Sequence, residues 1–278
     1  MSSSPIFRRV QVGGATDRGR VREKNEDHFV VAEVTRALHV QASSLPQPEM
    51  LFGDARVRGN LFIVADGMGG HNAGEQASWL AVVTIEDMLI NTLRWFFRLT
   101  GDAILTEFQS AVRAADERIF HEAARQPALR GMGTTLTMAY VVNRTLFSVH
   151  VGDSRLYVHR NTKMYQLTND HTLVGELVRS NAIDAEAAAR HPMRNVITNS
   201  VGGDKPGVNP EVHKVALEPY DTLLLCSDGL TEMVADAEIA ELLAGDEEPQ
   251  ELCEKLIARA NDKGGHDNIT AVVARFLP

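Results

Sequence analysis

Five aspartates stand where apolar, strand-like segments of the sequence begin or end. Asp66 closes the run FIVAD and is followed by GMGG. Asp153 and Asp228 also follow such segments, whereas Asp27 and Asp267 precede them. One Asp-Gly pair alone usually marks a turn. Five carboxylates that meet at one edge of a sheet would repel one another and raise each other's pKa, unless a cation neutralised them.

These residues predict a site for hard divalent cations. Oxygen ligands without cysteine favour Mg²⁺ or Mn²⁺ over zinc. The glycines after Asp66 lack a Cβ, so a main-chain carbonyl there can also approach a metal. Arg22 lies four residues before Glu26 in the first motif, and a guanidinium beside such a cluster could bind phosphate through paired hydrogen bonds. Simple turns and a surface arginine are the alternatives at this point.

Strand-like segments rich in β-branched and aromatic residues carry these carboxylates. Tight turns at Asn143-Arg144 and Gly152-Asp153-Ser154 favour antiparallel pairing. Two long segments, 73 to 97 and 102 to 125, repeat apolar residues at helical spacing, and a third helical group covers about 236 to 262. Strands and helices occur in blocks without strict alternation, so we expect an α+β fold with layered antiparallel sheets.

We expect a single domain over 1 to 278. A chain of 278 residues that is 44% hydrophobic can bury a sizeable core, and no linker divides it. A loop insertion is expected over about 41 to 60, and a mobile flap over about 171 to 206. Cys226 and Cys253 are the only cysteines, so neither a disulfide framework nor a thiolate zinc site is indicated, and both are expected to be small buried residues.

Composition excludes some classes of function. The net charge is -9 and no Lys/Arg block stands out, so nucleic-acid binding is not expected. The first residues do not form a signal pattern, and no apolar run approaches the roughly 18 residues of a membrane span. We therefore expect a cytoplasmic protein that does not associate with membranes.

Eight motifs in order along nearly the whole chain resemble those of the metal-dependent Ser/Thr protein phosphatases, the PPM or type 2C family, and of its bacterial members in particular. The resemblance implies a four-layer α-β-β-α sandwich of two mainly antiparallel sheets flanked by helices. One short motif would mean little, but eight in register are specific. They are GATDRGRVREKNEDHF, FIVADGMGGHNAGE, MGTTLTMAYV, VHVGDSRLYVHR, QLTNDHT, HPMRNVITNSVG, DTLLLCSDGLTEMV and HDNITAVV.

The resemblance also implies which residues hold two metal ions, Mn²⁺ or Mg²⁺. Asp66 would bridge the two ions. Asp228 and Asp267 would complete the first site, and Asp27 with the carbonyl of Gly67 would hold the second.

Further residues match family positions around these ions. Asp153, together with Asp228, would bind a weaker third ion. Arg22 matches the arginine that binds phosphate, and Glu26 would lie close to the second ion. Asn268 is expected to support the ligands rather than to coordinate.

The implied reaction is hydrolysis of phosphoserine and phosphothreonine on proteins by a water activated between the metals, without a phosphoenzyme. The metals and Arg22 would stabilise charge on the phosphoryl oxygens. The implied partners are phosphorylated proteins and a cognate bacterial Ser/Thr kinase, and we expect a monomer.

Two positions depart from family patterns. Met68 stands where eukaryotic relatives carry a histidine that is thought to protonate the leaving group, although bacterial members commonly share this methionine. His71 is the nearest titratable substitute, but it lies near a helix N-terminus, where the macrodipole lowers its pKa. We therefore expect His71 to play a supporting role and a metal-bound water to be the acid. Asn199 replaces an arginine of many bacterial members, which bears on substrate choice.

Two other functions remain as alternatives. A catalytically silent PPM-fold module could bind phosphoproteins without hydrolysis, although Arg22 and every metal-ligand position are retained. A hydrolase of small phosphoesters is the second alternative. The chain lacks a Gly-rich phosphate loop with lysine, which weakens a nucleotide substrate.

Overall fold

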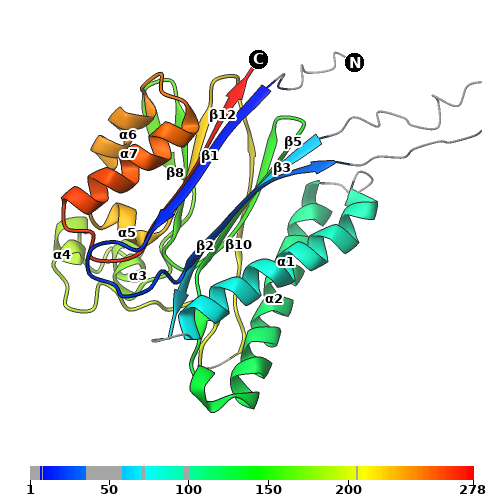
Figure 1. Ribbon diagram of the computed structural model, residues 1–278, viewed down its shortest axis with the longest axis vertical. Coiled ribbons are helices and arrows are strands. Elements are labelled where there is room, and N and C mark those ends of the chain that lie inside the picture. Colours follow the sequence, from blue (N-terminus) through cyan, green and yellow to red (C-terminus); the bar gives the residue numbers. More distant parts are fainter. Residues whose placement is uncertain (1–6, 8, 36–57, 70–72, 97–100, 205) are drawn as a thin grey trace, which may run out of the picture.

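The computed structural model is a sandwich in which two antiparallel β-sheets lie face to face and helices cover both outer faces (Figure 1). The expected four-layer α+β architecture is confirmed. One outer layer is formed by α1 (Ala73–Phe96) and α2 (Gly101–Arg125), and the opposite layer contains α6 (Asp236–Leu243) and α7 (Pro249–Asp262). The structure describes residues 7, 9–35, 58–69, 73–96, 101–204 and 206–278.

Among the described residues, the sheet beneath α6 and α7 has five strands, and the strand pairs within it are antiparallel. In spatial order they are β1 (Arg9–Asp17), β12 (Ile269–Leu277), β11 (Thr222–Cys226), β7 (Arg155–Arg160) and β8 (Lys163–Gln166).

In the part of the chain that the structure describes, the sheet beneath α1 and α2 has seven strands, again paired antiparallel. Its central strand β3 pairs with β5 on one side and with β2 on the other, and its last residues also pair with the short β4. The strands are β2 (Asp27–Thr35), β3 (Arg58–Met68), β4 (Gly133–Thr134), β5 (Leu136–Val142), β6 (Thr145–Val151), β9 (Val201–Gly202) and β10 (Glu211–Ala216).

Strand β3 explains why the sequence before Asp66 is continuously apolar. Phe62 and Val64 pack between the two sheets, whereas Leu61 and Ile63 pack toward α1 and α2. A strand that is buried on both faces loses the polar alternation of a surface strand. The apolar run therefore marks the centre of the sandwich, and Asp66 lies where this strand reaches the pocket described below.

The turn between β5 and β6 is formed by the two residues that the sequence indicates. Asn143 and Arg144 have φ angles of 48° and 65°, and Val142 pairs with Thr145 across them. Two successive positive φ angles are typical of the tight turn that matches the twist of a hairpin. The hairpin of β5 and β6 is confirmed, but the expected meander does not continue into β7. That strand lies in the other sheet, between β11 and β8, so the chain at Gly152-Asp153-Ser154 crosses from one sheet to the other.

Three expectations need adjusting. The helical group of about 236 to 262 is two helices, because Gly245 lies between them and Pro249 starts α7. The sequence pattern does not predict strands β8 and β10. They are short and partly exposed, so their sequences lack the apolar signal. Residues 41–57 of the expected insertion lie outside the described residues, and 58–60 begin β3.

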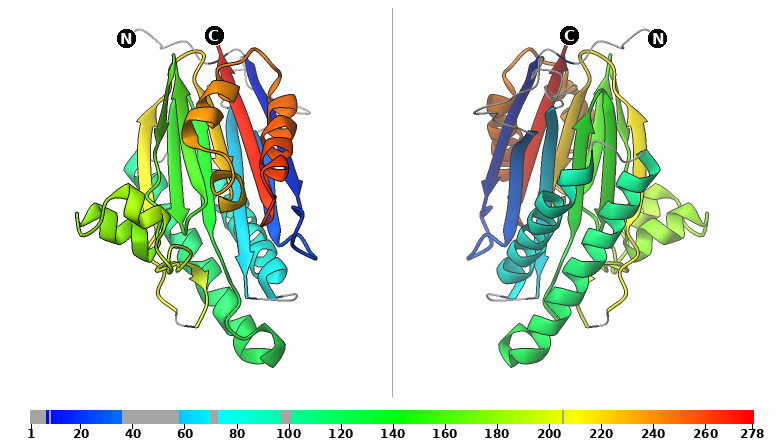
Figure 2. Two further views of the ribbon diagram at one scale, coloured as in Figure 1. Left: turned by 90° about the vertical axis from the view of Figure 1, so that its left-hand side faces the viewer. Right: turned by 90° about the vertical axis from the view of Figure 1, so that its right-hand side faces the viewer.

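Two short helices project from the body of the sandwich within the segment 171–206 (Figure 2). Thr172 caps α3 (Leu173–Arg179), and Asp184 caps α4 (Ala185–Ala189). Neither helix contains a buried residue, so few apolar contacts hold them to the core. We call 171–206 the flap.

Both cysteines are free and buried, Cys226 in β11 and Cys253 in α7, as expected. Among the described residues, no helix is both long and apolar enough to cross a membrane.

Candidate active site

A polar cavity of about 430 Å³ collects most of the residues that the sequence predicts for the site. Its wall includes the carboxylates of four of the five strand-end aspartates. Asp27 is the fifth and lies just behind this wall, directly opposite Asp66 in the pairing of β2 with β3. His71 lies outside the described residues. The predicted site residues in the wall are Arg22, Glu26, Asp66, Gly67, Asp153, Asp228, Asp267 and Asn268.

Asp27 is held from one side only. Ser227 and Thr270 donate hydrogen bonds of 2.7 and 2.6 Å to its Oδ2 atom. Its Oδ1 atom is buried and has no hydrogen-bond partner. Burial raises the pKa of Asp27 to about 6, although these hydrogen bonds oppose the shift. One carboxylate oxygen of Asp27 is therefore fixed and the other is left for a ligand.

Asp66 is fixed through its main chain. Its N–H donates to Thr135 Oγ1 at 3.0 Å, and its carbonyl accepts from Thr134 Oγ1 at 2.9 Å. Burial, followed by the charges of Asp27 and Asp228, raises the pKa of Asp66 well above its ordinary value. The side chain is thus aimed at the cavity by neighbours that do not neutralise it.

Asp228 begins the short helix α5 (Asp228–Thr231), directly after β11. Its Oδ1 atom is buried without a hydrogen-bond partner. Burial, and then the charges of Asp153 and Asp267, raise its pKa well above the ordinary range. Burial also raises the pKa of Asp153 to about 6.

The donor set fits hard divalent cations. The described residues include two buried carboxylate oxygens without a partner, Oδ1 of Asp27 and Oδ1 of Asp228, and such an uncompensated charge costs several kcal/mol. Ionised carboxylates only accept hydrogen bonds, so close aspartates cannot satisfy one another. A Mg²⁺ or Mn²⁺ ion would compensate both the charge and the vacant acceptors.

Gly67 occupies a position that no larger residue could take. A Cβ atom there would lie 2.1 Å from the carbonyl oxygen of Gly74 at the start of α1. The main chain of Gly67 also donates to the carbonyl of Glu26 at 3.2 Å. The glycine thus lets the end of β3, the start of α1 and the residue before β2 pack against one another.

Asn268 supports the pocket by fixing the main chain around it. Its Oδ1 atom accepts from the N–H of Glu26 at 2.8 Å, and its Nδ2 atom donates to the carbonyls of Arg18 and Lys24. Every polar atom of this side chain is therefore bonded to the segment that carries Arg22. The supporting role of Asn268 at the site stays a prediction.

Arg22 lies at the rim of the cavity. Its Nη2 atom is 2.5 Å from Oδ2 of Asp267, and 54% of its side chain is exposed. The hydrogen bond with Asp267 raises the pKa of Arg22 despite partial burial. A long, exposed side chain at this position can turn from Asp267 toward an anion in the cavity.

Several residues within the sequence motifs support the aspartates, although the sequence pattern does not predict this role. Ser227 precedes Asp228 and Thr270 follows Asn268 by two positions, yet both bind Asp27. Thr135 lies 69 residues from Asp66 in the chain. Only the strand order places these hydroxyl groups beside the aspartates, so local spacing offers no signal for them.

A second cavity of about 780 Å³ lies between the flap and α5. It shares Asp153, Asn195 and Asp228 with the first cavity, so the two cavities adjoin. We call it the flap groove. Its remaining wall combines apolar and charged side chains, among them Val174, Val178, Ala188, Arg194, Glu232 and Met233.

A family model described as protein phosphatase 2C matches residues 39–273. The serine/threonine phosphatase stp of Listeria innocua is 38% identical over 258 residues, which cover 93% of this chain and 92% of that protein. Protein phosphatase PhpP of Streptococcus pneumoniae is 37% identical over 213 residues, covering 77% of this chain and 84% of that one.

Solved structures agree with this similarity. The serine/threonine phosphatase PstP/Ppp of Mycobacterium tuberculosis superposes with a TM-score of 0.78 at 34% identity, covering 97% of this chain and 99% of that one. The catalytic domain of the protein phosphatase PstP in complex with two manganese ions superposes with a TM-score of 0.75 at 33% identity, with the same coverage.

Proposed function

The chain belongs to the protein phosphatase 2C family and is a metal-dependent protein-serine/threonine phosphatase, and we propose that its strand-end carboxylates hold the metal ions. The observation that carries this proposal is the pair of buried, unpartnered carboxylate oxygens on Asp27 and Asp228. These atoms also argue against a catalytically silent binding module, which would have no use for them.

We propose two Mn²⁺ or Mg²⁺ ions and a weaker third. Asp66 would be shared by the first two ions. Asp228 and Asp267 would complete one site, and Asp27 with the Gly67 carbonyl would complete the other. The third ion would use Asp153 together with Asp228. When bound, such ions supply a nucleophile by lowering the pKa of water and neutralise charge on the phosphoryl oxygens.

The chain's own residues orient this site. Ser227 and Thr270 occupy one oxygen of Asp27 and turn the other toward the ligand. Thr135 holds the main chain of Asp66. Arg22 would leave Asp267 when substrate arrives and bind two phosphoryl oxygens, because a guanidinium matches that geometry.

The test is hydrolysis of a phosphothreonine peptide and of an aryl phosphate with Mn²⁺, Mg²⁺ or a chelator. We expect turnover of both substrates with either ion and none in excess chelator. Turnover of the aryl phosphate alone would favour a small-phosphoester hydrolase, and binding without turnover would favour the silent module.

Arg22→Ala should raise KM for the phosphopeptide about tenfold and change kcat much less. A contact that is made in both the ground state and the transition state contributes uniform binding. The affinity for Mn²⁺ should hardly change. Steady-state kinetics and a Mn²⁺ titration measure both effects.

Arg20→Ala is the matched control, because Arg20 is exposed and lies outside the cavity wall. It should behave like the unmodified protein. A large loss of Mn²⁺ affinity in Arg22→Ala, with KM unaltered, would instead make Arg22 a structural residue.

We propose that the flap groove receives the peptide on one side of the phosphorylated residue. Ala188→Trp should then lower kcat/KM for the phosphopeptide about tenfold, because the indole would fill the groove, and leave aryl phosphate within about twofold. Ala187→Trp is the control, because Ala187 is exposed and is not part of the groove wall. Equal losses on both substrates would show that the flap supports the core instead.

The supporting role of His71, a metal-bound water as the acid, a cognate Ser/Thr kinase, a monomeric state and a cytoplasmic location stay predictions. The bacterial phosphatases to which the chain is similar are consistent with a kinase partner.

A further inference from the structure

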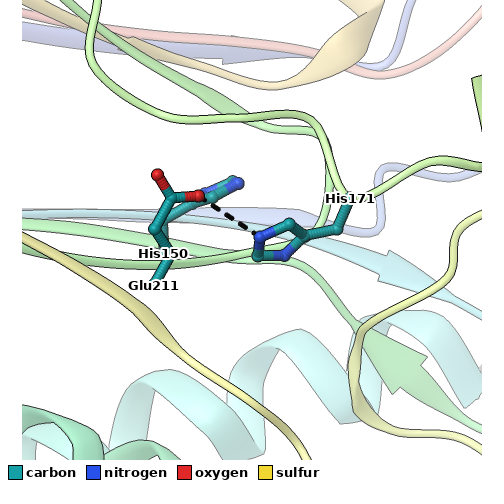
Figure 3. A group of neighbouring side chains, drawn as sticks. All are labelled: His150, His171 and Glu211. Atoms are coloured by element: carbon teal, nitrogen blue, oxygen red, sulfur yellow. Dashed lines mark ion pairs between the residues drawn. The ribbon is translucent and has the colours of Figure 1, made fainter. Parts of the chain in front are cut away.

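Three side chains outside the active site converge at the base of the flap. His150, His171 and Glu211 offer ligand atoms that all lie within 4.8 Å of one another, and Figure 3 shows them facing one another, with Glu211 paired to His171. Glu211 stands opposite His150 in the pairing of β10 with β6, which places both on one face of the sheet. His171 comes from the turn after β8.

The hydrogen bonds leave these atoms no vacancy for a metal. His150 Nδ1 lies 2.9 Å from Thr137 Oγ1, and its Nε2 lies 3.1 Å from two main-chain carbonyls, so Nε2 carries the proton. Glu211 Oε1 accepts from Asn169 Nδ2 and bonds His213 Nε2, and Oε2 accepts from the N–H of Asn169 and pairs with His171. The cluster is therefore a closed hydrogen-bond network.

The network fixes the tautomer of His171. Its Nδ1 atom accepts from the N–H of Gly152 at 3.2 Å and from Asn199 Nδ2 at 3.1 Å. Because Nδ1 is an acceptor, the proton of the neutral ring is on Nε2, which faces Oε2 of Glu211 at 3.3 Å. Glu211 thus selects the tautomer that can hold Gly152.

Gly152 needs such support. Its φ angle is +106°, a conformation that favours glycine, and a Cβ there would lie 2.6 Å from Thr135. His171 holds it from both sides, because the His171 N–H also donates to the Gly152 carbonyl at 2.7 Å. The next residue is Asp153, which faces both cavities.

We propose that Glu211 is a positioning residue that sets Asp153 at the active site by acting through His171 and Gly152. The inference rests on the proposed function, because it assumes that Asp153 contributes to catalysis. Through Glu211, the edge strand β10 would contribute to the reaction, although Glu211 does not line the active-site cavity.

A double-mutant cycle with Mn²⁺ and the aryl phosphate tests this. Glu211→Gln should lower kcat about tenfold, as expected for a residue that orients a metal ligand, with KM nearly unchanged. If Glu211 acts through Asp153, adding Glu211→Gln to Asp153→Asn should cost less than about twofold more. His213→Gln is the control: it removes one partner of Glu211 but leaves His171, and should stay within about twofold of the unmodified protein.

Spectroscopy supplies a readout besides activity. In Glu211→Gln, the ¹⁵N signals of His171 should lose the Nε2-protonated pattern, and the Gly152 amide should exchange with solvent at least about tenfold faster. Both should be unchanged in His213→Gln.

Losses of kcat that multiply in the double variant would overturn the inference. So would an Asp153→Asn variant with unchanged kcat, or a Glu211→Gln variant in which the His171 ¹⁵N signals and the Gly152 amide exchange rate are unchanged. Zn²⁺ binding that persists in Asp228→Asn but is lost in Glu211→Gln would also overturn it, by making the cluster a metal site. Failure of the proposed function is a different result, since the unmodified protein would then show no metal-dependent turnover.

Discussion

Asp228→Asn should lower kcat about a thousandfold with either substrate while the fold stays intact. The substitution removes one negative charge from a carboxylate that lies beside two other proposed ligands, and metal-ion stabilisation of the transition state is worth several kcal/mol. Loss of activity with a preserved circular dichroism spectrum would locate the effect at the site. The metal-free variant should be as stable as the unmodified protein or more stable, because one of several repelling buried charges is gone.

Asp236→Asn is the matched control. Asp236 lies eight residues further on, at the start of α6, and accepts a hydrogen bond from Tyr157 without lining the first cavity. Its kcat should remain within about threefold of the unmodified value, since the change weakens only a part-buried hydrogen bond from Tyr157 and the ion pair with Arg155 at 3.6 Å. Near-full activity of Asp228→Asn would refute the assignment of Asp228 as a ligand.

Much of the fold could be predicted because its signals are local. The buried strand β3 is visible in the sequence as a continuous apolar run, and α2 repeats apolar residues at helical spacing. Strand β10 has no such signal, because it is an edge strand whose residues are half-buried or exposed. Its place in the sheet is set by pairing with β6, 60 or more residues earlier in the chain.

The aspartates could be predicted because the end of a strand is visible in sequence, and the ends of paired strands meet. The groups that orient these aspartates could not be predicted from the sequence. Asp27 and Thr270 are 243 residues apart, and the Glu211 carboxylate reaches the active site only through His171 and Gly152. Such partners depend on strand order and register, which residue spacing does not encode.

The buried carboxylates also govern stability. In an unfolded chain an aspartate has a pKa of about 3.9, whereas burial raises those of Asp27 and Asp153 to about 6 in the folded protein. Between these values the metal-free folded state binds more protons than the unfolded state. Its stability therefore falls as pH rises from about 4 to about 6, on the order of 2 kcal/mol for each group.

His150 changes the pH dependence of folding stability in the opposite direction. Burial, and then the charge of His171, lower the pKa of His150 to about 4, below the value of about 6.5 for an unfolded chain. Stability from this group is lost as pH falls through that range. The histidine is outside the aspartate cluster, so its contribution is the same with and without metal and cancels in a comparison of the two.

The difference in melting temperature with and without Mn²⁺ should therefore increase from pH 5 to pH 7.5. Metal ligands must be deprotonated to bind, so affinity rises as protons are lost from the aspartates. At about a thousand times Kd, binding adds about 4 kcal/mol, which corresponds to roughly 10 °C for a domain of this size. Differential scanning calorimetry at matched ionic strength measures it, and Asp228→Asn should lose most of the shift. A shift that is independent of pH would show that the ions bind away from these carboxylates.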